Sequence, residues 1–162
     1  MLKKTCFPFL FLVVSFLLLH SSNAYSANYL KGVDSEGKKV YLGPTPIEQT
    51  AAFKTYAQSS RSAVHEQQYL FQRLKDAPKN LEYFHDGNWY NWLETYRGGM
   101  WLIRNRYKKG QDTREFLKKY VWRSEAGKLH LVRYPDGSIQ VGYNLLLNEL
   151  DLLEETLKKK AS

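Results

Sequence analysis

The chain has 162 residues, with 24 lysines and arginines against 16 aspartates and glutamates and a net charge of +8 at pH 7. A chain of this length ordinarily forms one domain that can fold without disulfide bonds. Its single cysteine, Cys6, lies in a segment that we expect to be removed, which excludes disulfides, cysteine nucleophiles and cysteine-ligated zinc from the mature protein.

Residues 1–24 have the three parts of a secretory signal peptide. Two lysines precede an apolar run that ends at Leu19, and small polar residues follow it up to Ala24. The run is shorter than the roughly 20 residues of a membrane-spanning helix. We therefore expect cleavage after Ala24, with Ala27 as the alternative, and an exported protein that is periplasmic in a Gram-negative bacterium and otherwise secreted.

Residues 25–62 are the least compact part of the chain by composition, and we expect a hairpin and an extension there. Two short strand-like segments flank a turn at residues 34–37. Thr45, Pro46 and Glu48 then favour a helix start, with a hydroxyl cap, a proline in the first turn and a carboxylate that can reach back. The compact domain is expected over residues 63–162.

Between Phe53 and Leu74, residues recur at spacings of three and four, which places them on one side of a helix. Ser59, Ser60 and Ser62 interrupt this pattern and are weak helix formers. The sequence thus predicts either one long helix weakened at the serines or two helices, the second over about residues 62–76.

Residues 81–91 have strand character around an Asp86-Gly87 turn, and Asn91 can cap the helix that follows. One face of that helix is expected to be buried, because Trp92, Tyr96, Met100, Ile103 and Tyr107 recur at helical spacing. Gly98 and Gly99 each cost roughly 1 kcal/mol in a helix interior. Their presence predicts either a close approach of another backbone or a bend.

A second line on the same helix carries positive charge around a tryptophan: Arg97, Trp101, Arg104 and Lys108. We expect Trp101 to face solvent with Arg97 stacked over its ring. These four residues are the predicted ligand-binding site, suited to an anionic ligand whose affinity falls with salt. The alternative is a solvated helix face with one packing tryptophan.

The rest of the chain predicts a helix from about Asp112 to Trp122, a hairpin around Pro135, Asp136 and Gly137, and a last helix over about residues 144–159. The whole is expected to be an α+β fold, with three to five helices packed with small antiparallel β-hairpins in a single compact domain.

From about Tyr69 to Glu154, the order of elements resembles the YfeK-like family of small exported bacterial proteins. The resemblance rests on Trp89-Tyr90 after a glycine turn, Phe116-Leu117 ending a helix pair, the turn from Arg123 to Gly127, and the 135–137 hairpin leading to Gly142. It implies export and one compact α+β domain. The family has no established activity, so the resemblance implies no catalytic residue. A departure is His130, where the family tends to have tyrosine.

Catalytic and metal chemistry find little support in the residue pattern. His65, His85 and His130 are far apart in the sequence, and a metal site would need them to meet, together with Asp86, in the folded chain. Ser124, six residues before His130, lacks the nucleophile turn of a hydrolase. We predict no catalytic residues, no metal and no cofactor.

The leading hypothesis is a non-enzymatic envelope protein that binds a partner protein or an anionic envelope component, a wall glycan or a lipid headgroup, through the basic-aromatic helix face. Nucleic acid is not an expected partner, and no transmembrane segment is expected after cleavage. The alternative is a cell-wall polymer hydrolase using carboxylates near the Asp-Gly turns, with Glu82, Asp86, Glu94 and Glu125 as the candidates.

Overall fold

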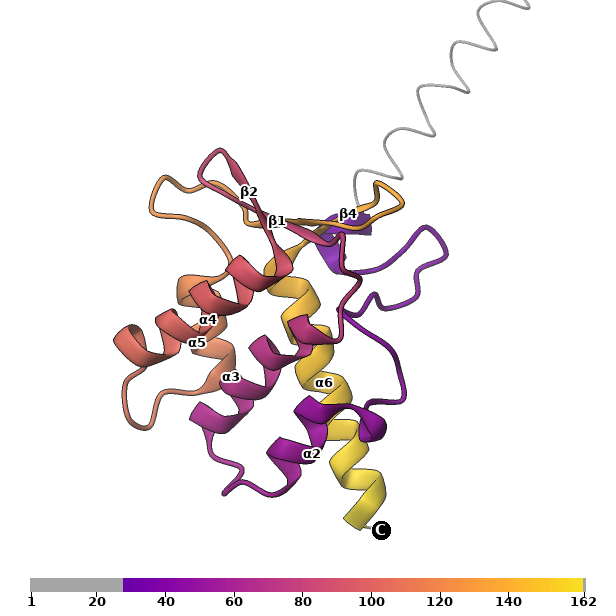
Figure 1. Ribbon diagram of the computed structural model, residues 1–162, viewed down its shortest axis with the longest axis vertical. Coiled ribbons are helices and arrows are strands. Elements are labelled where there is room, and N and C mark those ends of the chain that lie inside the picture. The colour runs from indigo at the N-terminus through magenta and orange to yellow at the C-terminus, as the bar shows by residue number, and fades with distance from the viewer. Residues whose placement is uncertain (1–27, 162) are drawn as a thin grey trace, which may run out of the picture.

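The computed structural model describes residues 28–161 (Figure 1). The expected signal peptide and both of its cleavage sites lie outside these residues. Among the residues described, no helix combines the length and the apolar character that a membrane span requires.

The first part of this range forms short elements. A 3-10 helix, η1 (Tyr29–Lys31), precedes a turn closed by a single bridge between Val33 and Lys39, a reduced form of the predicted hairpin. A second 3-10 helix, η2 (Ile47–Gln49), leads into α2 (Ala51–Ala57). The hydroxyl of Thr50 caps α2 by accepting from the Phe53 amide at 3.2 Å. A helical turn thus begins at Ile47, near the start predicted at Thr45, but the α-helix with a threonine cap begins only at Ala51.

The stretch between Phe53 and Leu74 forms two separate helices, as the second of the two predicted alternatives had it. The next helix is α3 (Ala63–Gln72), extended by η3 (Arg73–Lys75). The break falls at the serines, where the Ser59 hydroxyl donates to the Tyr56 carbonyl at 2.7 Å. Such local bonds offer the backbone an alternative to the helical pattern.

The predicted hairpin after α3 is confirmed as β1 (Glu82–His85) and β2 (Asn88–Asn91). The turn residues Asp86 and Gly87 have φ values of 46° and 96°, which suit an Asp-Gly pair. Helix α4 (Trp92–Arg106) follows at once. Asn91 caps it in a capping box, in which the Glu94 side chain accepts from the Asn91 amide at 2.9 Å.

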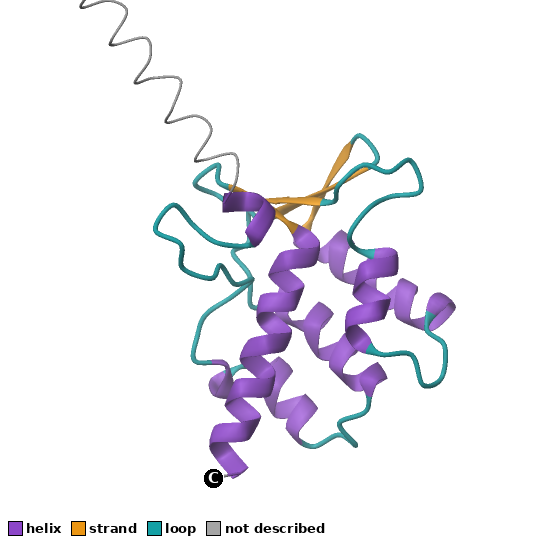
Figure 2. Ribbon diagram, turned by 180° about the vertical axis from the view of Figure 1, so that it is seen from behind, coloured by secondary structure: helices purple, strands orange, loops and turns teal. Residues whose placement is uncertain are grey.

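The C-terminal elements are α5 (Thr113–Tyr120), β3 (Leu131–Arg133), β4 (Ile139–Val141) and α6 (Gly142–Ala161). The two predicted hairpins join into one antiparallel sheet of order β2-β1-β3-β4. The join is the β1–β3 pairing, in which Tyr83 lies opposite Val132. The sheet lies at one end of the molecule with the helices on one side of it, and α6 runs from the sheet to the opposite end (Figures 1 and 2).

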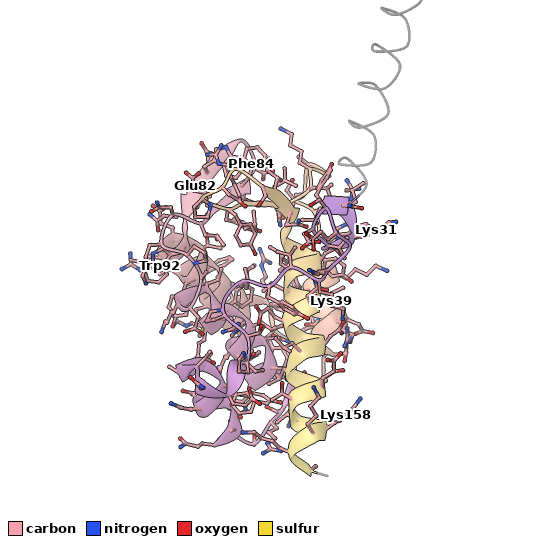
Figure 3. All side chains as sticks on the ribbon, turned by 90° about the vertical axis from the view of Figure 1, so that its right-hand side faces the viewer. Lys31, Lys39, Glu82, Phe84, Trp92 and Lys158 are labelled. Carbon is pink, nitrogen blue, oxygen red and sulfur yellow. The ribbon has the colours of Figure 1, made fainter. Side chains whose placement is uncertain are left out.

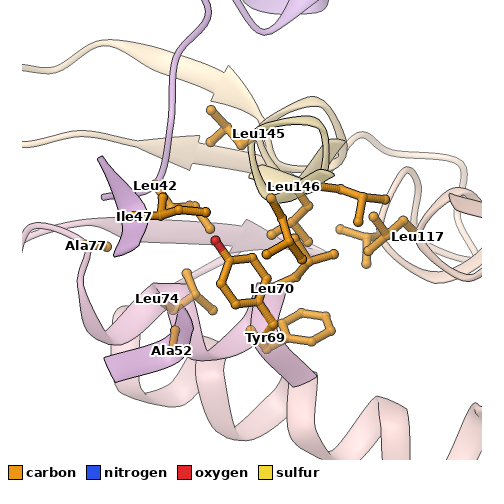
Figure 4. Packing of buried hydrophobic residues seen from close by; sticks show 14 of the residues in the cluster. Leu42, Ile47, Ala52, Tyr69, Leu70, Leu74, Ala77, Leu117, Leu145 and Leu146 are labelled. Carbon is orange, nitrogen blue, oxygen red and sulfur yellow. The ribbon is translucent and has the colours of Figure 1, made fainter. Parts of the chain in front are cut away.

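The core draws on the whole described chain, so the predicted α+β fold is confirmed as a single arrangement of five α-helices and one four-stranded sheet in this range. Leu70, Leu145 and Leu117 pack together from α3, α6 and α5 (Figure 4). Leu42 and Ile47, which precede residue 62, belong to the same cluster. Residues 28–62 therefore pack on the rest of the domain.

A buried ion pair fixes this N-terminal segment. Arg73 Nε lies 2.8 Å from Glu149 Oε2, and both side chains are fully buried. The second Glu149 oxygen accepts from the Leu42 amide at 2.7 Å, while Arg73 also donates to the Pro44 carbonyl at 3.0 Å. Burial alone would lower the pKa of Arg73, but the hydrogen bond and charge of Glu149 raise it above its usual value. Three separate segments thus meet at one charged pair.

A second, more exposed link ties the same segment to α6. Lys39 lies against that helix and pairs with Asp151 at 2.7 Å (Figure 3). Hydrogen bonding to Asp151 raises the pKa of Lys39. Because both side chains are partly exposed, this pair adds little stability compared with the buried one.

Candidate functional site

The predicted basic-aromatic residues lie on the exposed side of α4 and just after it. Trp101 is 51% exposed, the highest value among the large hydrophobic side chains of the described chain that face solvent. Arg97, Arg104 and Lys108 are exposed as well. Because α4 ends at Arg106, Lys108 follows the helix and does not continue its stripe.

The buried face of α4 is also as predicted in its main features. Ile103 is 6% exposed, and Tyr96, Met100 and Tyr107 pack partly buried against the core. Trp92, also predicted on this face, is half-buried outside that core cluster, with Lys79 Nζ 4.3 Å from the centre of its ring. The residue stacked over Trp101 is different from the expected one. It is Arg106, whose guanidinium carbon lies 5.9 Å from the centre of the ring. The prediction of Arg97 at this position was wrong, and Arg97 stays available to solvent.

A cavity of about 290 Å³ lies next to Trp101 and was not predicted from the sequence. Its walls come from the sheet, α3, α4, α5 and α6, and they are mostly apolar. Residues that define it include Phe71, Tyr83, Tyr90, Trp101, Leu102 and Val132. The lining residues that are exposed are Glu94, Gly98 and Trp101, all on α4, so the cavity opens along that helix. Trp101 therefore belongs both to the basic-aromatic face and to the cavity.

The two glycines of α4 have different surroundings, and neither packs against another backbone, which was the first of the two predicted explanations. A Cβ on Gly99 would lie 2.1 Å from the Phe71 ring, so Gly99 lets that aromatic side chain approach the helix. A Cβ on Gly98 would have no neighbour within 4 Å. Packing therefore does not require a glycine at position 98, and the absence of a side chain there leaves the edge of the cavity open.

Two histidines that are distant in the sequence meet in the cavity wall because β1 pairs with β3. His85 Nδ1 lies 2.9 Å from His130 Nε2, and His130 Nδ1 lies 2.9 Å from the Val121 carbonyl. The carbonyl can only accept, so His130 must carry its proton on Nδ1 when neutral and must accept from His85 through Nε2. Each ring therefore orients the next.

Asp86 and Ser124 complete this group at the end of the β1–β2 hairpin. The nearby Ser124 hydroxyl, followed by the charge of His85, lowers the pKa of the exposed Asp86 carboxyl, although Ser124 Oγ is buried without a hydrogen-bond partner in the described chain. His65 is elsewhere, where its Nδ1 contacts the hydroxyls of Ser60 and Ser62. Within residues 28–161, no set of three histidine, cysteine or acidic side chains is arranged to hold a metal ion.

The four carboxylates weighed for glycoside cleavage are engaged separately. Glu82 pairs with Arg133 at 2.6 Å across β1 and β3. Strand alternation places Glu82 on the sheet face opposite Tyr83 and His85, which line the cavity. Glu94 caps α4, and Glu125 is exposed in the turn after α5. The sequence could not show the Glu82–Arg133 pair, because it depends on the pairing of β1 with β3 and on the sheet face that each residue occupies.

Burial, followed by the charge of His85, lowers the pKa of His130. The folded protein therefore binds fewer protons at this site than the unfolded chain, whose histidines titrate near pH 6.5. We expect the free energy of unfolding to fall as the pH drops below about 6.5, where the unfolded chain takes up the extra proton. Urea unfolding at about pH 8 and about pH 5.5 measures this change.

His130→Gln is the matched variant, because it keeps a polar side chain but removes the titrating ring. Its unfolding free energy should change less between the two pH values than that of the wild type. An equal change in both proteins would show that other groups cause the pH dependence.

Fold and site together define an α+β protein with an aromatic-lined cavity and a basic rim. Comparison with protein-family models, curated proteins and solved structures finds no match for this chain. The YfeK-like resemblance stays a prediction, and the function has to be argued from the site itself.

Proposed function

We propose that this is an exported, non-enzymatic envelope protein that binds an anionic component of the cell envelope through the exposed side of α4. The observation that carries the proposal is the exposure of Trp101, at 51%, between exposed cations. A solvent-facing indole forgoes roughly 25 cal/mol for each Å² of apolar area that stays wet. That cost is recovered when a partner covers the ring.

The charges around Trp101 support an anionic partner. Arg97 and Arg104 flank the indole on the helix, and Arg106 stacks over its ring. The one acidic residue of α4 is Glu94, whose carboxylate already accepts a hydrogen bond from the Asn91 amide. An anionic ligand that covers the Trp101 ring is therefore also attracted by the arginines around it.

The chemistry elsewhere supports binding more than catalysis. Two polar side chains of the cavity wall, His85 and His130, hydrogen-bond each other at 2.9 Å. The Glu82 carboxylate is paired across the sheet with Arg133, and the Glu94 carboxylate accepts a hydrogen bond from the Asn91 amide. No observation on the site favours the hydrolase alternative, and we do not propose it.

The test is sedimentation of the mature protein with phosphatidylglycerol vesicles or with isolated wall sacculi. The two arms separate lipid headgroups from wall polymer as the source of the anion. We expect retention in one arm at low salt and release at about 0.5 M salt, where the Debye length is short. Arg104→Ala should weaken binding about fivefold, because one cation near an anionic surface contributes about 1 kcal/mol.

Lys118→Ala is the control, since it removes one exposed charge from α5 instead. Its retention should be close to that of the wild type. No retention in either arm, or an equal loss in both variants, would contradict the proposal. If the mature protein bound neither vesicles nor sacculi but retained an envelope protein from an extract, a protein partner would be favoured.

A further inference from the structure

The cavity beside Trp101 differs chemically from the basic face with which it shares that residue. Its walls are mostly aromatic and aliphatic, while the cations lie outside it on the solvent side of α4. At about 290 Å³ it is at the lower end of the range of ligand pockets, roughly 300–1,000 Å³. The site thus has a small apolar compartment next to a positively charged surface.

We propose that the cavity receives the hydrocarbon chain of a single-chain anionic amphiphile, whose head lies on the arginines beside Trp101. This inference rests on the proposed function and names the ligand class more narrowly. The small volume favours one chain over two. The opening along Gly98 lets the chain enter between α4 and the sheet, since no atom from outside the adjoining part of α4 lies within 4 Å of the place where a Cβ would stand.

Charge complementarity selects the head group. Arg106 stacks 5.9 Å from the centre of the Trp101 ring, which is itself part of the cavity wall. Arg97 is exposed one turn earlier on the same helix. Glu94, the carboxylate at the opening, is partly compensated by the Asn91 amide at 2.9 Å. A carboxylate or phosphate head is therefore favoured over an ammonium head.

The polar groups of the wall argue against a sugar as the buried part. His85 and His130 use ring nitrogens on each other at 2.9 Å, and His130 uses its other nitrogen on the Val121 carbonyl. The rest of the wall is mostly apolar, so most hydroxyls of a buried sugar would face groups that cannot hydrogen-bond with them, which is costly. A hydrocarbon chain has no polar groups and needs no hydrogen-bond partners.

Calorimetric titration of the mature protein with monomeric dodecanoate tests the inference. Dodecyltrimethylammonium carries the same chain with the opposite charge, and acetate carries the same head without the chain. We expect saturable binding of dodecanoate, binding of dodecyltrimethylammonium at least about tenfold weaker, and no measurable binding of acetate. Equal binding of the two long-chain compounds would overturn the assignment of the head group.

Gly98→Phe is the blocking variant, because Gly98 lines the cavity edge and a Cβ there meets no core atom, so the added ring can be accommodated at the opening. It should weaken dodecanoate binding at least about tenfold. Thr55→Phe, at an exposed site on α2, adds the same side chain away from the cavity and should bind like the wild type. Circular dichroism verifies that both variants are folded.

The vesicle and sacculus experiment keeps this inference separate from the proposed function. Undiminished dodecanoate binding by Gly98→Phe, or no binding by the wild type, overturns the inference even if salt-sensitive retention on anionic material persists. If both Arg104→Ala and Gly98→Phe were retained on the anionic material as well as the wild type is, the proposed function would be overturned instead.

Discussion

Arg73→Met is expected to lower the free energy of unfolding by about 3–5 kcal/mol, the largest effect of any single substitution considered for this protein. The substitution leaves Glu149 fully buried without its partner at 2.8 Å. It also removes the donor to the Pro44 carbonyl, which loosens the hold on the N-terminal segment. Urea unfolding followed by circular dichroism measures the change.

Two further variants separate the charge from the packing. The double variant Arg73→Met with Glu149→Leu should be more stable than Arg73→Met alone, because the fully buried carboxylate is then gone and only the partly exposed Asp76 has lost its partner. Arg133→Met breaks the Glu82 pair, whose side chains are both 40% exposed, and should cost about 1 kcal/mol or less. A similar cost for Arg73→Met and Arg133→Met would contradict this account of the buried pair.

Gly99→Ala and Gly98→Ala are expected to change stability in opposite directions, although the two residues are neighbours in one helix. A Cβ on Gly99 would lie 2.1 Å from Phe71 Cδ1 and 2.5 Å from its Cγ. Since Cγ is near the root of the side chain, a small rotation of the ring cannot relieve the overlap. We expect Gly99→Ala to cost about 1–3 kcal/mol net of the gain in helix propensity.

Gly98→Ala meets no such obstacle and should stabilise the protein by up to about 1 kcal/mol, the helix-propensity difference between glycine and alanine. Combining Gly99→Ala with Phe71→Leu should recover part of the lost stability, because the smaller side chain makes room for the methyl group. Thermal unfolding of the set measures these differences. Equal effects at positions 98 and 99 would mean that the environments of the two glycines are alike.

Features set by a few adjacent residues were predictable from the sequence. Asn91 with Glu94 three residues later predicts the start of α4, and the structure shows the capping box. Asp86-Gly87 and Pro135-Asp136-Gly137 predict hairpin turns for the same reason, since the turn conformation depends on the residues in it. The exposure of Trp101 also followed from helical spacing alone.

Competition between nearby signals limited the prediction at the first helix. Thr45 and Thr50 both precede helix-compatible residues, and the sequence pattern favours Thr45 because a proline and a glutamate follow it. In the structure the cap is Thr50, because the core packing of Ile47 and Phe53 fixes where the regular helix begins. Tertiary packing decides between caps of similar strength.

Long-range contacts explain what the sequence could not show. His85 and His130 meet only because β1 pairs with β3. Arg73, in the 3-10 extension of α3, meets Glu149 only because α3 packs against α6. The cavity likewise depends on walls from five elements. The local sequence signal of the cavity was Gly98, a residue that weakens a helix and contributes nothing to its stability. The separate role of Gly99 required the position of Phe71.

The proposed function explains why α4 combines features that reduce its own stability. An exposed tryptophan, a glycine without a packing partner and several neighbouring cations all cost stability or solubility in an isolated protein. Each of them becomes useful when an anionic amphiphile covers the helix and fills the space beside it. The helix is held in place for this role by its capping box and by the packing of Gly99 against Phe71.

The most direct measurement is a residue-resolved NMR titration of the mature protein with dodecanoate and, separately, with phosphatidylglycerol nanodiscs. The account predicts that the largest shifts occur at the Trp101 indole and at the amides of residues 97–106, and that they diminish in high salt. Shifts confined to the outer face of the sheet around Phe84 and Trp89, with the Trp101 signal unchanged, would contradict it.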